Sequence, residues 1–209
     1  MNTPKTIALL GGTFDPIHNG HLIPAKHVAQ WLGLEQIRLM PAHIPPHKSL
    51  VTASAAQRVD MVKLASESEP LFMCDERELN RSEHSYTVDT LNEIKNEQPN
   101  SVLFFIIGMD SLLTFTQWKN WQEILTLCHL VVNCRPNYPL ENLNDETQSL
   151  IKNYGVITQS QSLDINDLKF ISNPKKNCAG QIYFAPEIAF DISSLIFAAS
   201  TDSMSLNND

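Results

Sequence analysis

The chain has 209 residues, 43% hydrophobic and 18% charged, which is enough to bury one core of ordinary domain size. Its 15 basic and 23 acidic side chains give a formal net charge of −8 without any run of lysine or arginine, which excludes wrapping around nucleic acid. No apolar stretch is long enough to span a membrane, no signal-peptide core follows Met1, and the four cysteines are scattered, so we expect a cytoplasmic protein.

Apolar runs and helical periods alternate along the chain. In chain order, the pattern predicts a strand at 6–10, a helix at 22–32, a strand at 36–40, a helix at 54–66, a strand at 71–74, a helix at 86–96, a strand at 101–107, helices at 111–113 and 121–128, and a strand at 130–134. Positions 137–180 are polar and indicate only a helix near 145–154, and short strands follow at 182–184 and 189–192. This alternation predicts a single-domain α/β fold, Rossmann-like and doubly wound, with a mostly parallel sheet.

The segment between the first strand and the first helix, residues 11–21, is the most informative in the chain. It reads Gly-Gly-Thr-Phe-Asp-Pro-Ile-His-Asn-Gly-His and holds three of the seven glycines. A strand, a glycine turn and a helix start in succession offer backbone N–H groups to a phosphate. His18 and His21 are three residues apart at the helix start, so we expect both imidazoles on one face.

This arrangement suits nucleotidyl transfer, in which a phosphate oxygen displaces pyrophosphate from the α-phosphorus of a nucleoside triphosphate. The protein then mainly aligns the reactants and stabilises charge on phosphoryl oxygens. Two alternatives exist: a simple strand-to-helix turn with a histidine cap, or a zinc cluster of His18, His21, His43 and His47. The second lacks interleaved carboxylate or thiolate ligands.

Parallel sheets bind ligands beyond the carboxyl ends of their strands. Four segments are expected at that edge: residues 11–21, the Pro- and His-rich stretch 41–48, the turn 108–111, and Arg135. They predict one composite site.

The stretch Gly11–His21 resembles the HxGH signature of the nucleotidyltransferase superfamily. Further stretches, PAHIPPHK at 41–48, SYT at 85–87, IIGMDS at 106–111 with Trp118, and CRP at 134–136, resemble the bacterial nicotinate-nucleotide adenylyltransferases within it. The similarity runs from about residue 6 to residue 194. It implies transfer of the adenylyl group of ATP to nicotinate mononucleotide, which gives deamido-NAD and pyrophosphate in NAD biosynthesis.

The resemblance implies a role for each matching residue. His18, His21 and Lys48 would be catalytic. The residues implied for ATP binding are Gly11, Gly12, Thr13, Phe14, His18, Gly20, His21, Gly108, Asp110, Arg135 and Ser193. Those implied for the mononucleotide are His47, Lys48, Tyr86, Thr87 and Trp118, with an aromatic face stacking on the pyridine ring. Trp118 and Trp121 also fit core positions, and Arg58 fits a solvated helix face.

The carboxyl-terminal end departs from the family pattern. Residues 1–194 are assigned to the nucleotidyltransferase domain, where the family continues Ile-Ser-Ser/Ala-Thr-x-Ile-Arg and then two helices. Here Ile192-Ser193-Ser194 is followed by Leu195 to Ser200, so the threonine and the arginine are missing. Residues 195–209 are expected to be a divergent, disordered tail, and the lost phosphate contacts to impair activity.

We expect no dedicated protein metal site, with Mg²⁺ delivered by ATP. ATP and nicotinate mononucleotide are the expected partners, without nucleic acid or membrane, and the chain is expected to be a monomer or weak homo-oligomer. The preference for nicotinate over nicotinamide mononucleotide stays open. The alternatives are a non-catalytic or damaged mononucleotide-binding copy and another HxGH enzyme such as a phosphopantetheine adenylyltransferase.

Overall fold

The computed structural model describes residues 5–43, 51–81, 84–134, 143–156 and 180–186. Strands and helices alternate along the chain, as the sequence pattern predicts. The strands are β1 (Thr6–Gly12), β2 (Ile37–Pro41), β3 (Phe72–Cys74), β4 (Val102–Gly108), β5 (His129–Asn133), β6 (Gly155–Val156) and β7 (Ile182–Ala185). The α-helices are α1 (Asn19–Leu32), α2 (Ala55–Glu67), α3 (Thr87–Glu97), α4 (Met109–Leu113), α5 (Trp121–Leu127) and α6 (Asp145–Tyr154), with short 3₁₀ turns at Arg77–Asn80 and Phe115–Gln117.

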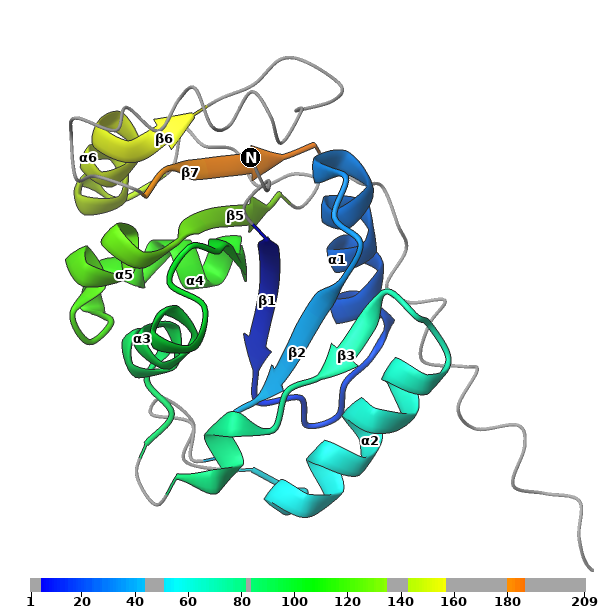
Figure 1. Ribbon diagram of the computed structural model, residues 1–209. Helices are drawn as coiled ribbons and strands as arrows, with labels where there is room; N and C mark the ends of the chain where they lie inside the picture. The colour runs from blue at the N-terminus through cyan, green and yellow to red at the C-terminus, as the bar shows by residue number, and fades with distance from the viewer. Residues whose placement is uncertain (1–4, 44–50, 82–83, 135–142, 157–179, 187–209) are drawn as a thin grey trace, which may run out of the picture.

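The seven strands form one sheet in the order β3-β2-β1-β4-β5-β7-β6, and every neighbouring pair is parallel. Helices α1 and α2 lie on one face, and α3, α4, α5 and α6 lie on the other (Figure 1). Such a sheet, wound in both directions from β1, is the doubly wound Rossmann-like arrangement. The predicted fold class is confirmed.

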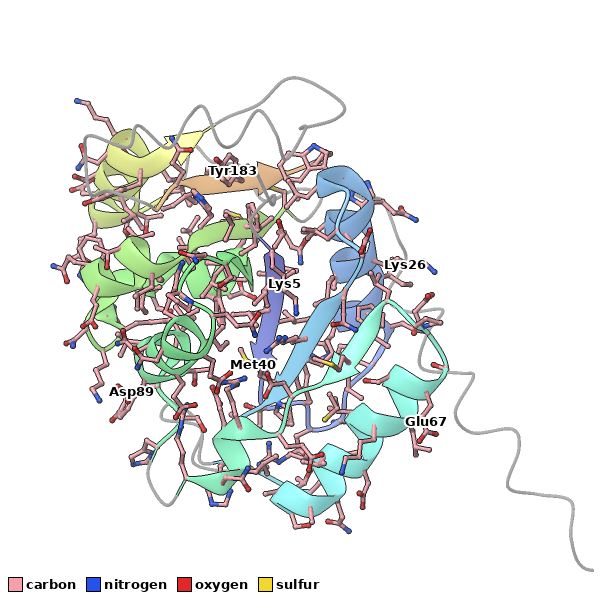
Figure 2. The ribbon with its side chains drawn as sticks, in the orientation of Figure 1. Lys5, Lys26, Met40, Glu67, Asp89 and Tyr183 are labelled. Carbon is pink, nitrogen blue, oxygen red and sulfur yellow. The ribbon has the colours of Figure 1, made fainter. Side chains whose placement is uncertain are left out.

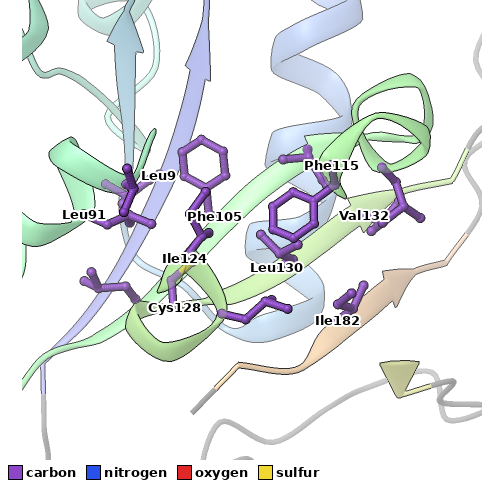
Figure 3. Close-up of a cluster of buried hydrophobic side chains, with 14 of the residues drawn as sticks. Leu9, Leu91, Phe105, Phe115, Ile124, Cys128, Leu130, Val132 and Ile182 are labelled. Carbon is purple, nitrogen blue, oxygen red and sulfur yellow. The ribbon is translucent and has the colours of Figure 1, made fainter. Parts of the chain in front are cut away.

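Two hydrophobic clusters, one on each face, hold the helices to the sheet. Alternate residues of a strand point to opposite faces, so Ile7 and Leu9 of β1 join the cluster under α3 and α5, while Ala8 and Leu10 join the cluster under α1. Figure 3 shows the first cluster, where Leu91 of α3 and Ile124 of α5 meet the sheet residues. Both faces of the sheet are therefore shielded from solvent, which explains why β4 is a continuous apolar run in the sequence.

The predicted elements are confirmed to within one or two residues where the structure describes them, except that α1 begins three residues earlier than expected. Its start at Asn19 brings Gly20 and His21 into the helix. The two-residue strand β6 and the two 3₁₀ turns were not predicted. The expected strand at 189–192 and the boundary at 194 lie outside the described residues. Among the described helices, none is long and apolar enough to cross a membrane.

The order of the strands reverses between β1 and β4, because the chain builds β2 and β3 on one side of β1 before crossing to β4. The register aligns the carboxyl ends of four neighbouring strands. Gly12 pairs with Pro41, and Gly108 pairs with Asn133. Ligands of open α/β sheets bind beyond the carboxyl ends at this kind of reversal, so the fold places the loops after β1, β2, β4 and β5 around one position.

A buried histidine lies at the other end of the strands, where β5 begins. His129, at the start of β5, is 7% exposed; its ring stacks on Phe104, and its Nδ1 accepts a hydrogen bond from the backbone N–H of Gln181. Burial, with a smaller contribution from the Lys95 charge, lowers the pKa of His129 to about 4. The folded protein therefore keeps this imidazole neutral.

This low pKa predicts acid-sensitive stability. Between pH 6.5 and 4 the unfolded chain binds a proton on His129 that the folded chain does not, so the free energy of unfolding falls as the pH falls through that window. From pH 7 to pH 5 the His129 contribution is about 2 kcal/mol. His129→Gln keeps a hydrogen-bond acceptor but cannot bind the proton. In urea unfolding, its free energy of unfolding should fall by about 2 kcal/mol less between pH 7 and pH 5 than that of the parent chain. Equal losses would contradict the assignment.

Candidate active site at the carboxyl edge of the sheet

The loop between β1 and α1 is held by the ring of Phe14. Phe14 has φ = 49°, in the left-handed region that bulky residues rarely adopt, and its side chain is 2% exposed. The ring folds back over Gly12, where an added Cβ would lie 2.9 Å from it, and meets the His21 ring edge-on at 5.3 Å. Gly12 is therefore required by the packing of Phe14, which supports His21 from below.

His18 and His21 lie together at the start of α1, and the prediction that they share one face is confirmed. Their ring centroids are 3.9 Å apart, with 36° between the planes. His21 Nδ1 accepts a hydrogen bond from the backbone N–H of His18 at 3.3 Å. A neutral His21 ring then carries its proton on Nε2, where it can donate to a ligand.

Gly20 is the close neighbour of the His18 ring. An added Cβ at Gly20 would lie 2.8 Å from both Cε1 and Nδ1 of His18. The glycine in His-x-Gly-His therefore leaves room for an imidazole, rather than for backbone approach to a ligand alone.

The amino-terminal turn of α1 is suited to an anion. Within this helix, which the structure describes in full, the first turn has no acidic side chain. The helix is 14 residues long, so its macrodipole places partial positive charge at the turn that carries the two imidazoles. Charge and donors converge there although the chain as a whole is acidic.

Asp15 ties this loop to the segment before α2. Its carboxylate accepts hydrogen bonds from the backbone N–H of Thr52 at 2.6 Å, the Thr52 hydroxyl at 2.9 Å and the backbone N–H of Ala53 at 3.0 Å. The Thr52 backbone bond is the largest cause of a lowered pKa at Asp15. The carboxylate therefore stays ionised at neutral pH as a fixed anchor.

Arg58 is buried, so its assignment to a solvated helix face was wrong. Its side chain is 1% exposed, and its guanidinium donates to the carbonyl oxygens of Thr13 at 2.7 Å, Ala42 at 2.6 Å and His43 at 3.1 Å. Burial lowers the pKa of Arg58 and the Asp15 charge raises it, but a guanidinium stays protonated in proteins. A permanent cation therefore lies beneath the loops after β1 and β2.

Ser85, Tyr86 and Thr87 lie at the start of α3, and Ser85 connects them to β2. The Ser85 hydroxyl accepts a hydrogen bond from the backbone N–H of His43 at 3.0 Å. Lys119 Nζ lies 4.4 Å from the centroid of the Tyr86 ring, which brings the segment of Trp118 next to Tyr86. The loops after β1 and β2 and the start of α3 are thus connected.

Trp118 lies at the rim of the core. Its ring packs edge-on against Phe105 and, tilted, against Phe115, and it remains partly exposed. Trp121, also partly buried, contacts Phe115 and Tyr154 instead. Both indoles pack against the core, and the exposed part of Trp118 is compatible with stacking on a ligand.

Gly108 ends β4 and caps α4, and a Cβ added to it would meet nothing within 4 Å. Asp110 follows in the first turn of α4 and is exposed. Both therefore border open space at the strand-order reversal, next to the carboxyl end of β1.

Four predicted site residues, His47, Lys48, Arg135 and Ser193, lie outside the described residues.

Met40, which Figure 2 labels close to the carboxyl end of β2, is 1% exposed. Met40 therefore belongs to the hydrophobic core beneath the end of β2. Within the ranges that the structure describes, no three His, Cys, Asp or Glu side chains lie close enough to hold a metal ion.

Neither the anchoring hydrogen bonds of Asp15 nor the burial of Arg58 was predicted from the sequence. A signal for Arg58 was available: it lies four residues before Val62 and so shares a helix face with an apolar residue. Asp15 offered none, because its partners Thr52 and Ala53 are far along the chain.

Known proteins resemble this chain over most of its length. The family described as cytidylyltransferase-like matches residues 9–196. A relative from Psychromonas ingrahamii, named "probable nicotinate-nucleotide adenylyltransferase", is 43% identical over 91% of this chain and 83% of its own. The chain belongs to the nicotinate-nucleotide adenylyltransferase family.

A second member of this family, from Aeromonas salmonicida, is 54% identical over 63% of this chain and 62% of its own. Among solved structures, the Plasmodium falciparum nicotinic acid mononucleotide adenylyltransferase in complex with NaAD has a TM-score of 0.62. It is 16% identical and covers 89% of this chain and 78% of its own, so it supports the fold.

The contact between Gly20 and His18 predicts a variant in which activity and stability change in opposite directions. Gly20→Ala should displace the His18 imidazole, because the added Cβ would lie 2.8 Å from that ring, while alanine favours the helix by up to about 1 kcal/mol. We expect adenylyl transfer to fall at least tenfold while the melting temperature stays equal or rises. Steady-state kinetics and thermal unfolding measure both.

Gln30→Ala, on the exposed face near the end of the same helix, is the matched control and should keep full activity. A fully active Gly20→Ala variant would show that the position of the His18 ring does not matter.

Proposed function

We propose that this chain transfers the adenylyl group of ATP to nicotinate mononucleotide and releases pyrophosphate. The observation that carries the proposal is the pair of imidazoles, with ring centroids 3.9 Å apart, at the amino terminus of α1 and at the carboxyl edge of the sheet. Family membership supports it, because the relatives named above are nicotinate-nucleotide adenylyltransferases.

The reaction is an in-line displacement. A phosphate oxygen of the mononucleotide forms a bond to the α-phosphorus, the bond from that phosphorus to the bridging oxygen breaks, and pyrophosphate leaves with the electron pair. The negative charge on the phosphoryl oxygens must be stabilised. His18, His21 and the first-turn N–H groups of α1 would supply that stabilisation, and Thr13 would donate its hydroxyl to the same oxygens.

The adenosine would lie across the strand-order reversal. The open space at Gly108 lets the nucleotide approach the backbone at the end of β4. The exposed Asp110 carboxylate would accept hydrogen bonds from the ribose hydroxyls. Gly11, Gly12 and Phe14 would shape the floor of the phosphate site, and Arg135 and Ser193 would bind phosphate oxygens.

The pyridine ring would bind between Tyr86 and Trp118, and the backbone N–H groups at the start of α3, with the Thr87 hydroxyl, would hold its carboxylate. Lys48 and His47 would bind the mononucleotide phosphate. A phosphopantetheine substrate offers no ring for these aromatic side chains, which favours the nicotinate nucleotide over that alternative.

Mg²⁺ is proposed to arrive with ATP. The triphosphate supplies the hard oxygen ligands that Mg²⁺ prefers, and the ion keeps most of its waters. When bound, the ion would neutralise charge on the triphosphate.

The direct test is pyrophosphate release by the purified chain with Mg·ATP and nicotinate mononucleotide. We expect pyrophosphate and deamido-NAD in equal amounts, and a loss of about 100-fold or more in kcat for His18→Ala and for His21→Ala, because each removes a donor to the developing charge. Nicotinamide mononucleotide and phosphopantetheine, offered in parallel, test the acceptor. Turnover that is unchanged in both histidine variants would refute the roles proposed here.

A non-catalytic copy is the second candidate, favoured by the sequence beyond Ser194. The family match ends at residue 196, where leucine and alanine occupy positions 195 and 198 in place of the expected threonine and arginine. Losing one charge-assisted phosphate bond costs about 1.5–3 kcal/mol, equivalent to roughly ten- to a hundredfold in rate.

Leu195→Thr with Ala198→Arg, followed by a family-like helical tail, should therefore raise kcat by at least tenfold. The same tail with Leu195 and Ala198 retained is the control. Calorimetry that detects mononucleotide binding without pyrophosphate release would identify the non-catalytic copy, and an unchanged kcat in the restored variant would show that the tail does not limit the rate.

A further inference from the structure

One buried cation connects the two halves of the proposed site. Arg58 reaches from α2 to Thr13, which belongs to the triphosphate loop (residues 11–21), and to Ala42 and His43 at the end of β2. Its hydrogen bonds to these three residues are 2.6–3.1 Å long and end on backbone carbonyl oxygens of two different loops. A planar guanidinium with five donors can hold several carbonyls in a fixed geometry, whereas a lysine ammonium cannot hold them in one plane.

His43 carries the connection further. Its carbonyl accepts from Arg58, and its backbone N–H donates to the Ser85 hydroxyl at 3.0 Å. Ser85 is 8% exposed and directly precedes Tyr86 and Thr87, which with Trp118 form the proposed pyridine pocket. Thr13 and the pyridine pocket are thus joined through Arg58, His43 and Ser85.

Burial makes this connection stiff. Arg58 is 1% exposed, so water cannot replace the three carbonyls without opening the site, and a buried charge that loses its partners is costly. Asp15, the nearest counter-charge that acts on Arg58, is itself fixed by Thr52 and Ala53. Arg58 and Asp15 therefore anchor the triphosphate loop from two sides.

We propose that Arg58 is a positioning residue that sets the separation between the triphosphate loop and the pyridine pocket, with Ser85 extending its hold to the pocket. This inference rests on the proposed function. In-line attack requires the mononucleotide phosphate and the α-phosphorus to meet within about 3–3.5 Å, so an error in loop separation lowers the rate even when each substrate still binds. Arg58 touches neither substrate; it acts through the backbone of both loops.

The test compares two pairs of variants by steady-state kinetics and thermal unfolding. Arg58→Met removes the hydrogen bonds to both loops, so it should lower kcat at least tenfold and raise KM for ATP and KM for nicotinate mononucleotide at least fivefold each. Ser85→Ala leaves the bonds of Arg58 in place and removes the bond to His43, together with the bond of the same hydroxyl to Glu78. It should therefore raise KM for the mononucleotide at least threefold and leave KM for ATP within twofold. Arg58→Lys, which keeps the charge, should recover part of the loss.

Two matched controls separate positioning from stability. Arg38→Met removes a half-buried arginine on β2 whose guanidinium pairs with Asp75. Ser101→Ala removes a buried hydroxyl that donates to the carbonyl oxygen of Gln98, just before the amino-terminal end of β4. Both should lower the melting temperature as much as the test variants do while KM and kcat change by less than twofold. Arg58→Met with unchanged kcat, or Ser85→Ala with equal effects on both substrates, would overturn the proposal.

Hydrogen exchange covers the case in which Arg58→Met does not fold or the parent chain shows no turnover. In Arg58→Lys without substrates, amide exchange should rise at least threefold in residues 11–21 and in residues 40–43 together, but not in β5. Exchange that rises only within α2 would show a local structural role and refute the inference. A parent chain that makes no dinucleotide would refute the proposed function alone, since the exchange experiment needs no activity.

Discussion

The reversal of strand order between β1 and β4 is the constraint on which the site depends. A parallel sheet that grows in one direction sends every connecting helix to the same face, whereas growth in both directions from β1 sends helices to both faces and leaves the loops after β1 and β4 to diverge. Gly12 and Gly108 end these two strands. The opening between the loops is therefore a product of topology, and side chains only refine it.

Charge is the second constraint, because a chain of net charge −8 is proposed to bind two phosphorylated substrates. Three features bring hydrogen-bond donors or positive charge to this edge of the sheet: the amino terminus of α1, the adjoining imidazoles, and the Arg58 guanidinium beneath the loop. The last is shielded from salt by burial, so it acts more strongly than a surface lysine would. A few well-placed groups can thus favour phosphate binding although the chain has a net charge of −8.

The sequence predicted the fold well because the relevant forces are local or repetitive. Continuous apolar runs such as β4 are typical of strands buried on both faces, and the glycine turn before His18 indicates a strand-to-helix junction. Arg58 was assigned wrongly because its partners are carbonyl oxygens, which carry no side-chain signature in a sequence. The pairing of Asp15 with Thr52 and Ala53 was equally invisible, since it depends on how two loops 37 residues apart meet in space.

Phe14 combines a strained backbone conformation with a fully buried ring. A phenylalanine with φ = 49° holds a backbone strain on the order of 1–3 kcal/mol, which glycine at the same position would relieve. Only the ring, however, fills the space beneath His21 and over Gly12. Glycine would leave that space empty, and losing a buried aromatic ring costs about 3–5 kcal/mol, more than the strain that is relieved. The unfavourable backbone of Phe14 is therefore kept by the packing of its own side chain.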